Sequence, residues 1–179
     1  MDRDYDIYQR YPEDSLLWRC FVHGLENAKE TFSQADASVS ENSDACKKES
    51  NRLRILLVDD HPLLRKILRR TLERHPRFEV IGEAEDGAQA IVQSELLKPD
   101  VVLLDLSMPG MGGLDAARHI QKTVPEAAIV ILSVHTEQSY IDQAKMLGIH
   151  AYVPKIKSEA LFEAIDAAVR GEDFYILPT

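Results

Sequence analysis

The sequence predicts an α/β protein in which helices cover both faces of a parallel five-stranded sheet. From Arg52 onward, short apolar runs alternate along the chain with amphipathic stretches of helical period. The apolar runs are continuous in Val, Ile and Leu, which is typical of strands that are buried on both faces. Because strand and helix alternate strictly, the strands should be parallel, and the expected architecture is a doubly wound sandwich.

Turn and capping signals mark the helices between the expected strands. Pro62 stands at a first-turn position, and Gly148 follows the last apolar residue of another helical stretch. Asp86 is expected to cap a helix, with Gln89 three residues later. The final helix is expected over Ser158–Gly171. The five expected strands are Leu53–Val58, Phe78–Ala84, Val101–Leu104, Ala128–Leu132 and Ala151–Val153.

The composition changes twice ahead of this domain. Residues 1–32 carry two alternating apolar stretches and a short helical pattern, which predicts a small ββα appendage, below the length of about 40 residues that usually folds unaided. Residues 33–51 contain no aromatic residue and no Leu or Ile, as in a flexible linker. We therefore assign residues 52–175 to the main domain and residues 176–179 to a C-terminal tail.

Composition limits the classes of function. The chain has 179 residues and a net charge of −9, which argues against a nucleic-acid-binding surface spread over the whole molecule. Its two cysteines, Cys20 and Cys46, have neither the density nor the spacing of a disulfide framework or a zinc site. No signal peptide is recognisable, and no apolar stretch approaches the roughly 18 residues of a membrane span. We expect a soluble, cytoplasmic protein without a membrane partner.

Polar side chains stand where four of the expected strands end. Asp59 and Asp60 follow the first strand, Asp105 the third, Ser133 the fourth and Lys155 the fifth. In doubly wound sheets, ligands bind beyond the carboxyl ends of the strands. We therefore expect these side chains to converge on one edge of the sheet.

Charge balance predicts a divalent cation among these side chains. Each aspartate could instead cap the following helix or turn. However, Asp105 directly ends a buried apolar run, and three carboxylates are balanced only by the Lys155 ammonium together with a divalent ion. Oxygen ligands favour Mg²⁺, with Mn²⁺ a permissible substitute. A metal, a lysine and a hydroxyl together suit phosphoryl transfer, with the central Asp105 as the nucleophile.

The motifs at these strand ends carry a family resemblance. The segments are Leu57-Val58-Asp59-Asp60-His61, Leu104-Asp105 through Met108-Pro109-Gly110 to Gly113-Leu114, Leu132-Ser133-Val134-His135, and Ala151-Tyr152-Val153-Pro154-Lys155. In this order and spacing they resemble the receiver domain of two-component response regulators, from about Leu53 to Gly171, and in detail the NarL/FixJ type. The resemblance implies a flavodoxin-like (βα)5 fold. Such relatives usually continue into a helix-turn-helix DNA-binding domain, and this chain contains no such domain after Gly171.

The resemblance also implies a role for each site residue. Asp105 would accept the phosphoryl group, and Mg²⁺ would be held by Asp60, Asp105 and the backbone carbonyl of Ser107, with Asp59 assisting through water. Pro109 and the glycines after it would shape the adjoining loop.

Three further residues would respond to the phosphoryl group on Asp105. Lys155 would pair with one phosphoryl oxygen, the Ser133 hydroxyl would reorient towards another, and Tyr152 would turn inward as Ser133 moves. Alternatively, Ser133 caps the next helix, Tyr152 is an inert half-buried aromatic residue, and Lys155 is a surface lysine.

The expected function is a signalling switch. A sensor histidine kinase or phosphotransfer protein would phosphorylate Asp105, and the modified domain would change a protein contact or form a phosphorylation-dependent homodimer. Slow autodephosphorylation would not make it an enzyme. One alternative is a phosphatase of the haloacid-dehalogenase type, although the Asp-x-Asp motif of that type is missing after the first strand. Another is a binding module that is no longer phosphorylated.

One helix face is strongly basic. It would contact an acidic partner or the phosphodonor protein, or it is merely solvated. Its residues are Arg65, Lys66, Arg69, Arg70 and Arg74.

Overall fold

The computed structural model describes residues 52–176. The predicted ββα appendage over residues 1–32 and the predicted linker over residues 33–51 lie outside the described residues. The predicted tail is described only at Ile176. Among the described residues, no helix has the length and apolar character that a membrane crossing requires.

The described domain is built on one parallel sheet with the strand order β2-β1-β3-β4-β5-β6. The five predicted strands are confirmed, two of them one residue longer than expected. A sixth strand of two residues adds to the edge and pairs with Ala151 and Tyr152. The strands are β1 (Leu53–Val58), β2 (Phe78–Ala84), β3 (Val101–Leu104), β4 (Ala128–Ser133), β5 (Ala151–Pro154) and β6 (Phe174–Tyr175).

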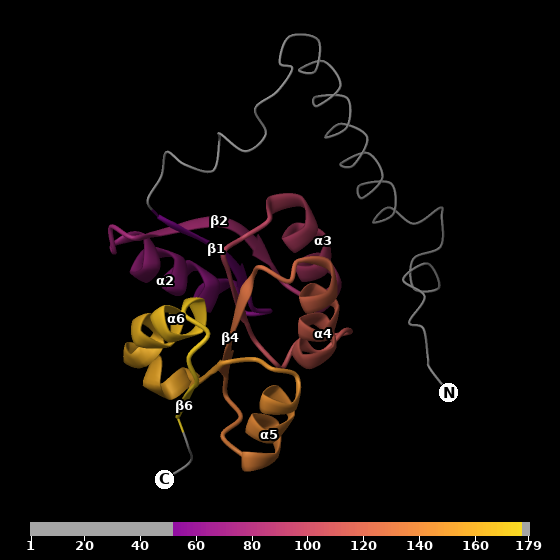
Figure 1. The fold of residues 1–179 in the computed structure, drawn as a ribbon. Coiled ribbons are helices and arrows are strands. Elements are labelled where there is room, and N and C mark those ends of the chain that lie inside the picture. Colours follow the sequence, from indigo (N-terminus) through magenta and orange to yellow (C-terminus); the bar gives the residue numbers. More distant parts are fainter. Residues whose placement is uncertain (1–51, 177–179) are drawn as a thin grey trace, which may run out of the picture. The chain divides into compact units, whose positions relative to one another are not determined.

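Helices cover both faces of this sheet, as the alternating sequence pattern predicts. Figure 1 shows α2 and α6 on one face and α3, α4 and α5 on the other. The doubly wound fold is therefore confirmed. The α-helices are α2 (Pro62–Glu73), α3 (Gly87–Leu97), α4 (Gly113–Thr123), α5 (Gln138–Met146) and α6 (Leu161–Val169).

Each strand supplies side chains to two separate apolar cores. In β1, Ile55 and Leu57 pack in the core under α2 and α6, whereas Leu56 and Val58 pack in the core under α3, α4 and α5. All four side chains are at most 1% exposed. Because neighbouring residues of a strand point to opposite faces, a run without polar residues is what two covered faces require.

The last helix begins later than predicted. Lys155–Ala160 form a 3₁₀ segment, and the regular helix α6 starts only at Leu161. Lys157 interrupts the helical backbone with φ −113° and ψ 39°. The predicted helix over Ser158–Gly171 therefore begins with a 3₁₀ turn, and it is α-helical only from Leu161 onward. The predicted cap is confirmed, since the amide of Gln89 donates to Asp86 at 2.8 Å.

The helix that follows β3 approaches the end of that strand very closely. A β-carbon on Gly113, the first residue of α4, would stand 2.1 Å from the carbonyl oxygen of Asp105 and 2.8 Å from the α-carbon of Leu106. The Gly113 amide donates to the Leu106 carbonyl at 3.1 Å. Only glycine fits at this position, which fixes where the chain turns after Asp105.

We expect Gly113→Ala to destabilise the domain by about 2–3 kcal/mol, because the backbone at Asp105 must shift to admit the methyl group. Urea unfolding monitored by circular dichroism measures this change. The matched control is Gly112→Ala, since a β-carbon there would meet only the Leu106 carbonyl at 3.9 Å. The control should lose less than about 1 kcal/mol. Equal losses in the two variants would contradict the role of the close approach.

Candidate functional site

The polar residues of the predicted site lie at the carboxyl edge of the sheet. Asp59 directly follows β1, Asp105 directly follows β3, Ser133 is the last residue of β4, and Lys155 directly follows β5. The strands β1 and β3 are neighbours although β2 lies between them in sequence. Asp59 and Asp105 therefore flank the point where the strand order reverses, which is where such sheets bind ligands.

The ammonium group of Lys155 lies between two buried carboxylates. Its Nζ atom is 2.7 Å from Oδ2 of Asp105 and 2.7 Å from Oδ2 of Asp59. The two aspartates are 2% and 1% exposed, and the Lys155 side chain is 13% exposed. Because burying unpaired carboxylates is costly, this lysine is the counter-ion that permits both of them.

Burial and pairing act in opposite directions on the site's titration. Burial raises the pKa of the Asp105 carboxyl above its ordinary value of 3.8, although hydrogen bonds from Lys155 and Ser107 oppose the rise. For Lys155, burial works to lower the pKa, but hydrogen bonds to Asp105 and Asp59 and their charges raise it above 10.5. At neutral pH the lysine therefore carries a full positive charge.

Backbone amides hold the remaining oxygens of the two carboxylates. Oδ1 of Asp105 accepts from the amide of Ser107 at 3.2 Å, and Oδ1 of Asp59 accepts from the amide of His61 at 2.8 Å. The amide of Asp105 itself donates to the Val58 carbonyl at 2.9 Å, which ties the end of β3 to the end of β1.

Asp60 completes an acidic pair with Asp59 that suits a divalent cation. Possible ligand atoms of Asp59, Asp60 and His61 lie within 4.8 Å of one another. Oδ1 of Asp60 is 2.9 Å from Nδ1 of His61, whose side chain is 75% exposed. Hard cations such as Mg²⁺ take oxygen ligands, so the carboxylates of this group fit better than the imidazole.

Ser133 and Tyr152 both contact the backbone of His135. The buried Ser133 hydroxyl oxygen accepts from the His135 amide at 3.2 Å, and the hydroxyl of the equally buried Tyr152 donates to the His135 carbonyl at 2.9 Å. Burial raises the pKa of Tyr152 to about 12, so it stays protonated. The His135 ring stacks on Tyr140 of α5 with centroids 4.4 Å apart. Sequence reasoning assigned His135 no such role, because the contacts are made by its backbone.

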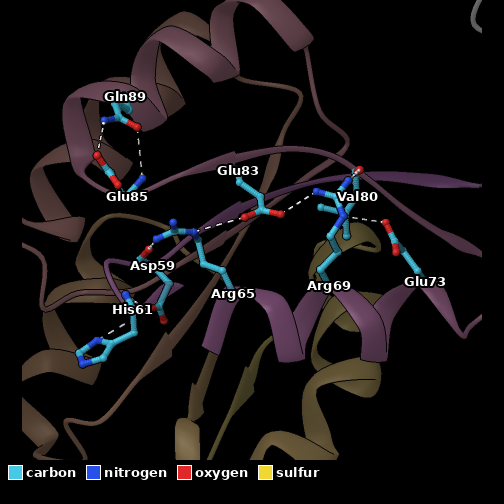
Figure 2. Close-up of polar contacts among 9 residues, drawn as sticks. All are labelled: Asp59, His61, Arg65, Arg69, Glu73, Val80, Glu83, Glu85 and Gln89. Carbon is cyan, nitrogen blue, oxygen red and sulfur yellow. Dashed lines mark hydrogen bonds and ion pairs between the residues drawn. The ribbon is translucent and has the colours of Figure 1, made fainter. Parts of the chain in front are cut away.

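The basic face of α2 is not uniformly solvated. Arg65 and Arg69 reach across to Glu83 of β2, with closest distances of 3.3 Å and 2.6 Å (Figure 2). The expectation of a single docking or solvated face is therefore wrong for these two residues. They stand one position after Leu64 and Leu68 of the apolar stripe, and this spacing was the available signal that they border the core. Lys66, Arg70 and Arg74 are exposed.

Comparison with known proteins agrees with this geometry. Residues 55–166 match the model of the response regulator receiver domain. The chain is 34% identical over 122 residues to the transcriptional regulatory protein DegU of Brevibacillus brevis, covering 68% of this chain and 52% of DegU. It is 39% identical over 128 residues to the nitrate/nitrite response regulator protein NarP of Escherichia coli K12, covering 71% of this chain and 60% of NarP.

A solved structure supports the same relationship. The crystal structure of a LuxR-family two-component response regulator from Aurantimonas sp. SI85-9A1 superposes with a TM-score of 0.66 at 37% identity. The match covers 71% of this chain and 91% of that one. The chain spans about half to three fifths of the length of the two curated relatives. The resemblance to the NarL/FixJ type is confirmed, and the chain belongs to the response regulator receiver domain family.

Proposed function

We propose that this chain is a phosphoacceptor switch in which Asp105 receives a phosphoryl group from a sensor histidine kinase or a phosphotransfer protein. The observation that carries the proposal is the Lys155 ammonium, held 2.7 Å from both Asp105 and Asp59 at the switch point of the sheet. A cation fixed beside a buried carboxylate can pair with the negative charge that a phosphoryl group adds.

The reaction joins an Asp105 carboxylate oxygen to phosphorus. As this bond forms, the bond between phosphorus and the donor's imidazole nitrogen breaks, and its electron pair returns to the imidazole. The product is an acyl phosphate on Asp105. Lys155 keeps its proton throughout and pairs with the phosphoryl oxygens, which stabilises the charge that the transfer brings to the site.

Asp59, Asp60, Asp105 and the backbone carbonyl of Ser107 would hold Mg²⁺ beside the acceptor. When bound, the metal neutralises phosphoryl charge and balances the three carboxylates together with Lys155. The donors of this group are mainly carboxylate oxygens, as Mg²⁺ requires, and Asp60 keeps 24% of its side chain exposed to a cation in solvent.

The hydrogen bonds of His135 offer a route from the acceptor to the surface. A phosphoryl oxygen on Asp105 would recruit the Ser133 hydroxyl, which now accepts from the His135 amide. The loop would follow, and with it the carbonyl that holds Tyr152 and the ring that stacks on α5. The surface built from α5, β5 and α6 would then favour a new protein contact or self-association. The chain would act in the cytoplasm by population shift, with only slow autodephosphorylation.

The phosphoryl group should be attached to Asp105 and to no other aspartate of the chain. After treatment with acetyl phosphate and Mg²⁺, we expect the full chain to be retarded on a phosphate-affinity gel. Asp105→Asn should abolish the shift, and chelation of Mg²⁺ should reduce it strongly, because metal stabilisation is worth several kcal/mol. Asp115→Asn, at an exposed residue of α4, is the control and should shift normally. An unshifted parent chain, or a shifted Asp105→Asn variant, would refute the proposal.

The raised pKa of Asp105 also predicts an effect on stability. A carboxyl whose pKa is raised by folding makes the folded state less stable once it ionises. Asp105→Asn should therefore raise the melting temperature at neutral pH, with Lys155 keeping Asp59 as its partner. The gain should become smaller as the pH falls towards and below 3.8, because Asp105 then becomes protonated in the unfolded state as well as in the folded state. Calorimetric melting at pH 3.5 and pH 7 tests this, and an equal gain at both would contradict it.

A further inference from the structure

The acidic pair is attached to the sheet through the backbone of Asp59. The Asp59 amide donates to the Ala84 carbonyl of β2 at 3.1 Å. Its carbonyl oxygen accepts from Nη1 of Arg65 at 2.6 Å, and within residues 52–176 this is the one donor to that oxygen. Asp59 is the first residue beyond β1, so its carbonyl has left the ladder of the sheet, and a side chain takes the place of the missing strand partner.

This carbonyl belongs to the peptide group that joins the two carboxylate residues. A peptide group is planar, so holding its oxygen restrains the two backbone dihedral angles on either side of it. These angles are ψ of Asp59 and φ of Asp60. The Asp59 side chain is additionally tied to His61 and Lys155, whereas the Asp60 side chain contacts only the exposed ring of His61 within the described chain. The direction of Asp60 therefore depends most on how this peptide group is oriented.

Arg65 is itself anchored, so it can hold the carbonyl in one place. Its side chain is 14% exposed, and Nε lies 3.3 Å from Oε2 of Glu83. The other oxygen of Glu83 accepts from Arg69 at 2.6 Å. Arg69 also contacts Glu73 at 2.9 Å and the Val80 carbonyl at 3.1 Å. Figure 2 shows this chain of contacts running from Asp59 through Arg65 and Glu83 to Arg69.

We infer that Arg65 is a positioning residue for the divalent cation: it orients the peptide group between Asp59 and Asp60 so that both carboxylates face one ion. The inference rests on the metal site of the proposed function. A planar guanidinium can donate to the carbonyl and to Glu83 at once in fixed directions, which an ammonium cannot do. Lysine at this position would keep the charge but lose the geometry.

Charge and positioning predict opposite effects on metal binding. As a cation near the acidic pair, Arg65 repels Mg²⁺, so its removal would tighten binding if charge were its only contribution. As a positioning residue it pre-orients the ligands, so its removal weakens binding. Outer contacts of this kind change metal affinity by about 10–100-fold.

The test is the Mg²⁺ dissociation constant of the full chain, measured by isothermal titration calorimetry without any phosphodonor. Arg65→Met should weaken Mg²⁺ binding by about 10-fold, and Arg65→Lys should also weaken it. Arg70→Met, an exposed change of the same charge on the same helix, should bind as tightly as the parent or slightly tighter. Arg69→Met removes the other partner of Glu83 and should change the constant less than about 3-fold.

Each outcome decides between the alternatives. Circular dichroism establishes whether the variants are folded. If Arg65→Met does not fold, Arg65→Lys is the variant used for the comparison. Unchanged or tighter Mg²⁺ binding in the Arg65 variants would overturn the inference while leaving the phosphoacceptor role intact. Equal weakening in Arg65→Met and Arg70→Met would overturn it as well, because the effect would then not depend on the carbonyl contact. A parent chain that binds no Mg²⁺ would overturn the metal site itself.

Discussion

The ion pair of Lys155 with two buried aspartates is the constraint on which the site depends. Both faces of the sheet are covered by helices, and the charged groups of the site lie where the strands end. Two carboxylates that are at most 2% exposed repel each other and lose their hydration, and only a cation placed between them offsets this cost. The third carboxylate, Asp60, is the most exposed of the three and leaves the cluster with surplus negative charge, which favours a further cation.

Backbone groups hold most of this arrangement. The amides of His61, Ser107 and His135 donate to Asp59, Asp105 and Ser133, each two residues earlier in sequence. Such short-range contacts place a side chain accurately because they involve no flexible partner. They also mean that a movement of Ser133 must break its bond to the following loop. The Ser133 contact leads through the backbone of His135 to the ring that stacks on Tyr140 of α5.

The ends of the strands could be predicted from the sequence because each continuous apolar run stops abruptly at a polar residue. It therefore anticipated that Asp105 and Lys155 meet. It missed β6, since two half-buried residues give no pattern, and it did not anticipate the 3₁₀ segment that precedes α6. It also treated Arg65 as a surface cation. Helical period alone places Arg65 beside the core but cannot say which strand residue it meets.

The partner of Arg65 is decided by an irregularity between β1 and β2. The register runs from Ile55 opposite Val80 to Leu56 opposite Gly82, so β2 contains one extra residue. Side chains alternate along a strand, and an unbroken β2 would direct Val80 and Ala84 to the same face. Instead Val80 packs in the core under α2, whereas Ala84 packs in the opposite core.

The extra residue thereby changes the face to which the end of β2 points its side chains. Glu83 pairs with Leu57, which faces α2, and so it comes within reach of Arg65 and Arg69. Without the extra residue, Glu83 would point towards α3 and the guanidinium of Arg65 would lose its anchor. The orientation of the acidic pair at the end of β1 thus depends on a one-residue bulge in the neighbouring strand. The signal for this bulge in the sequence is Gly82, an isolated glycine inside β2 that stands at the register shift.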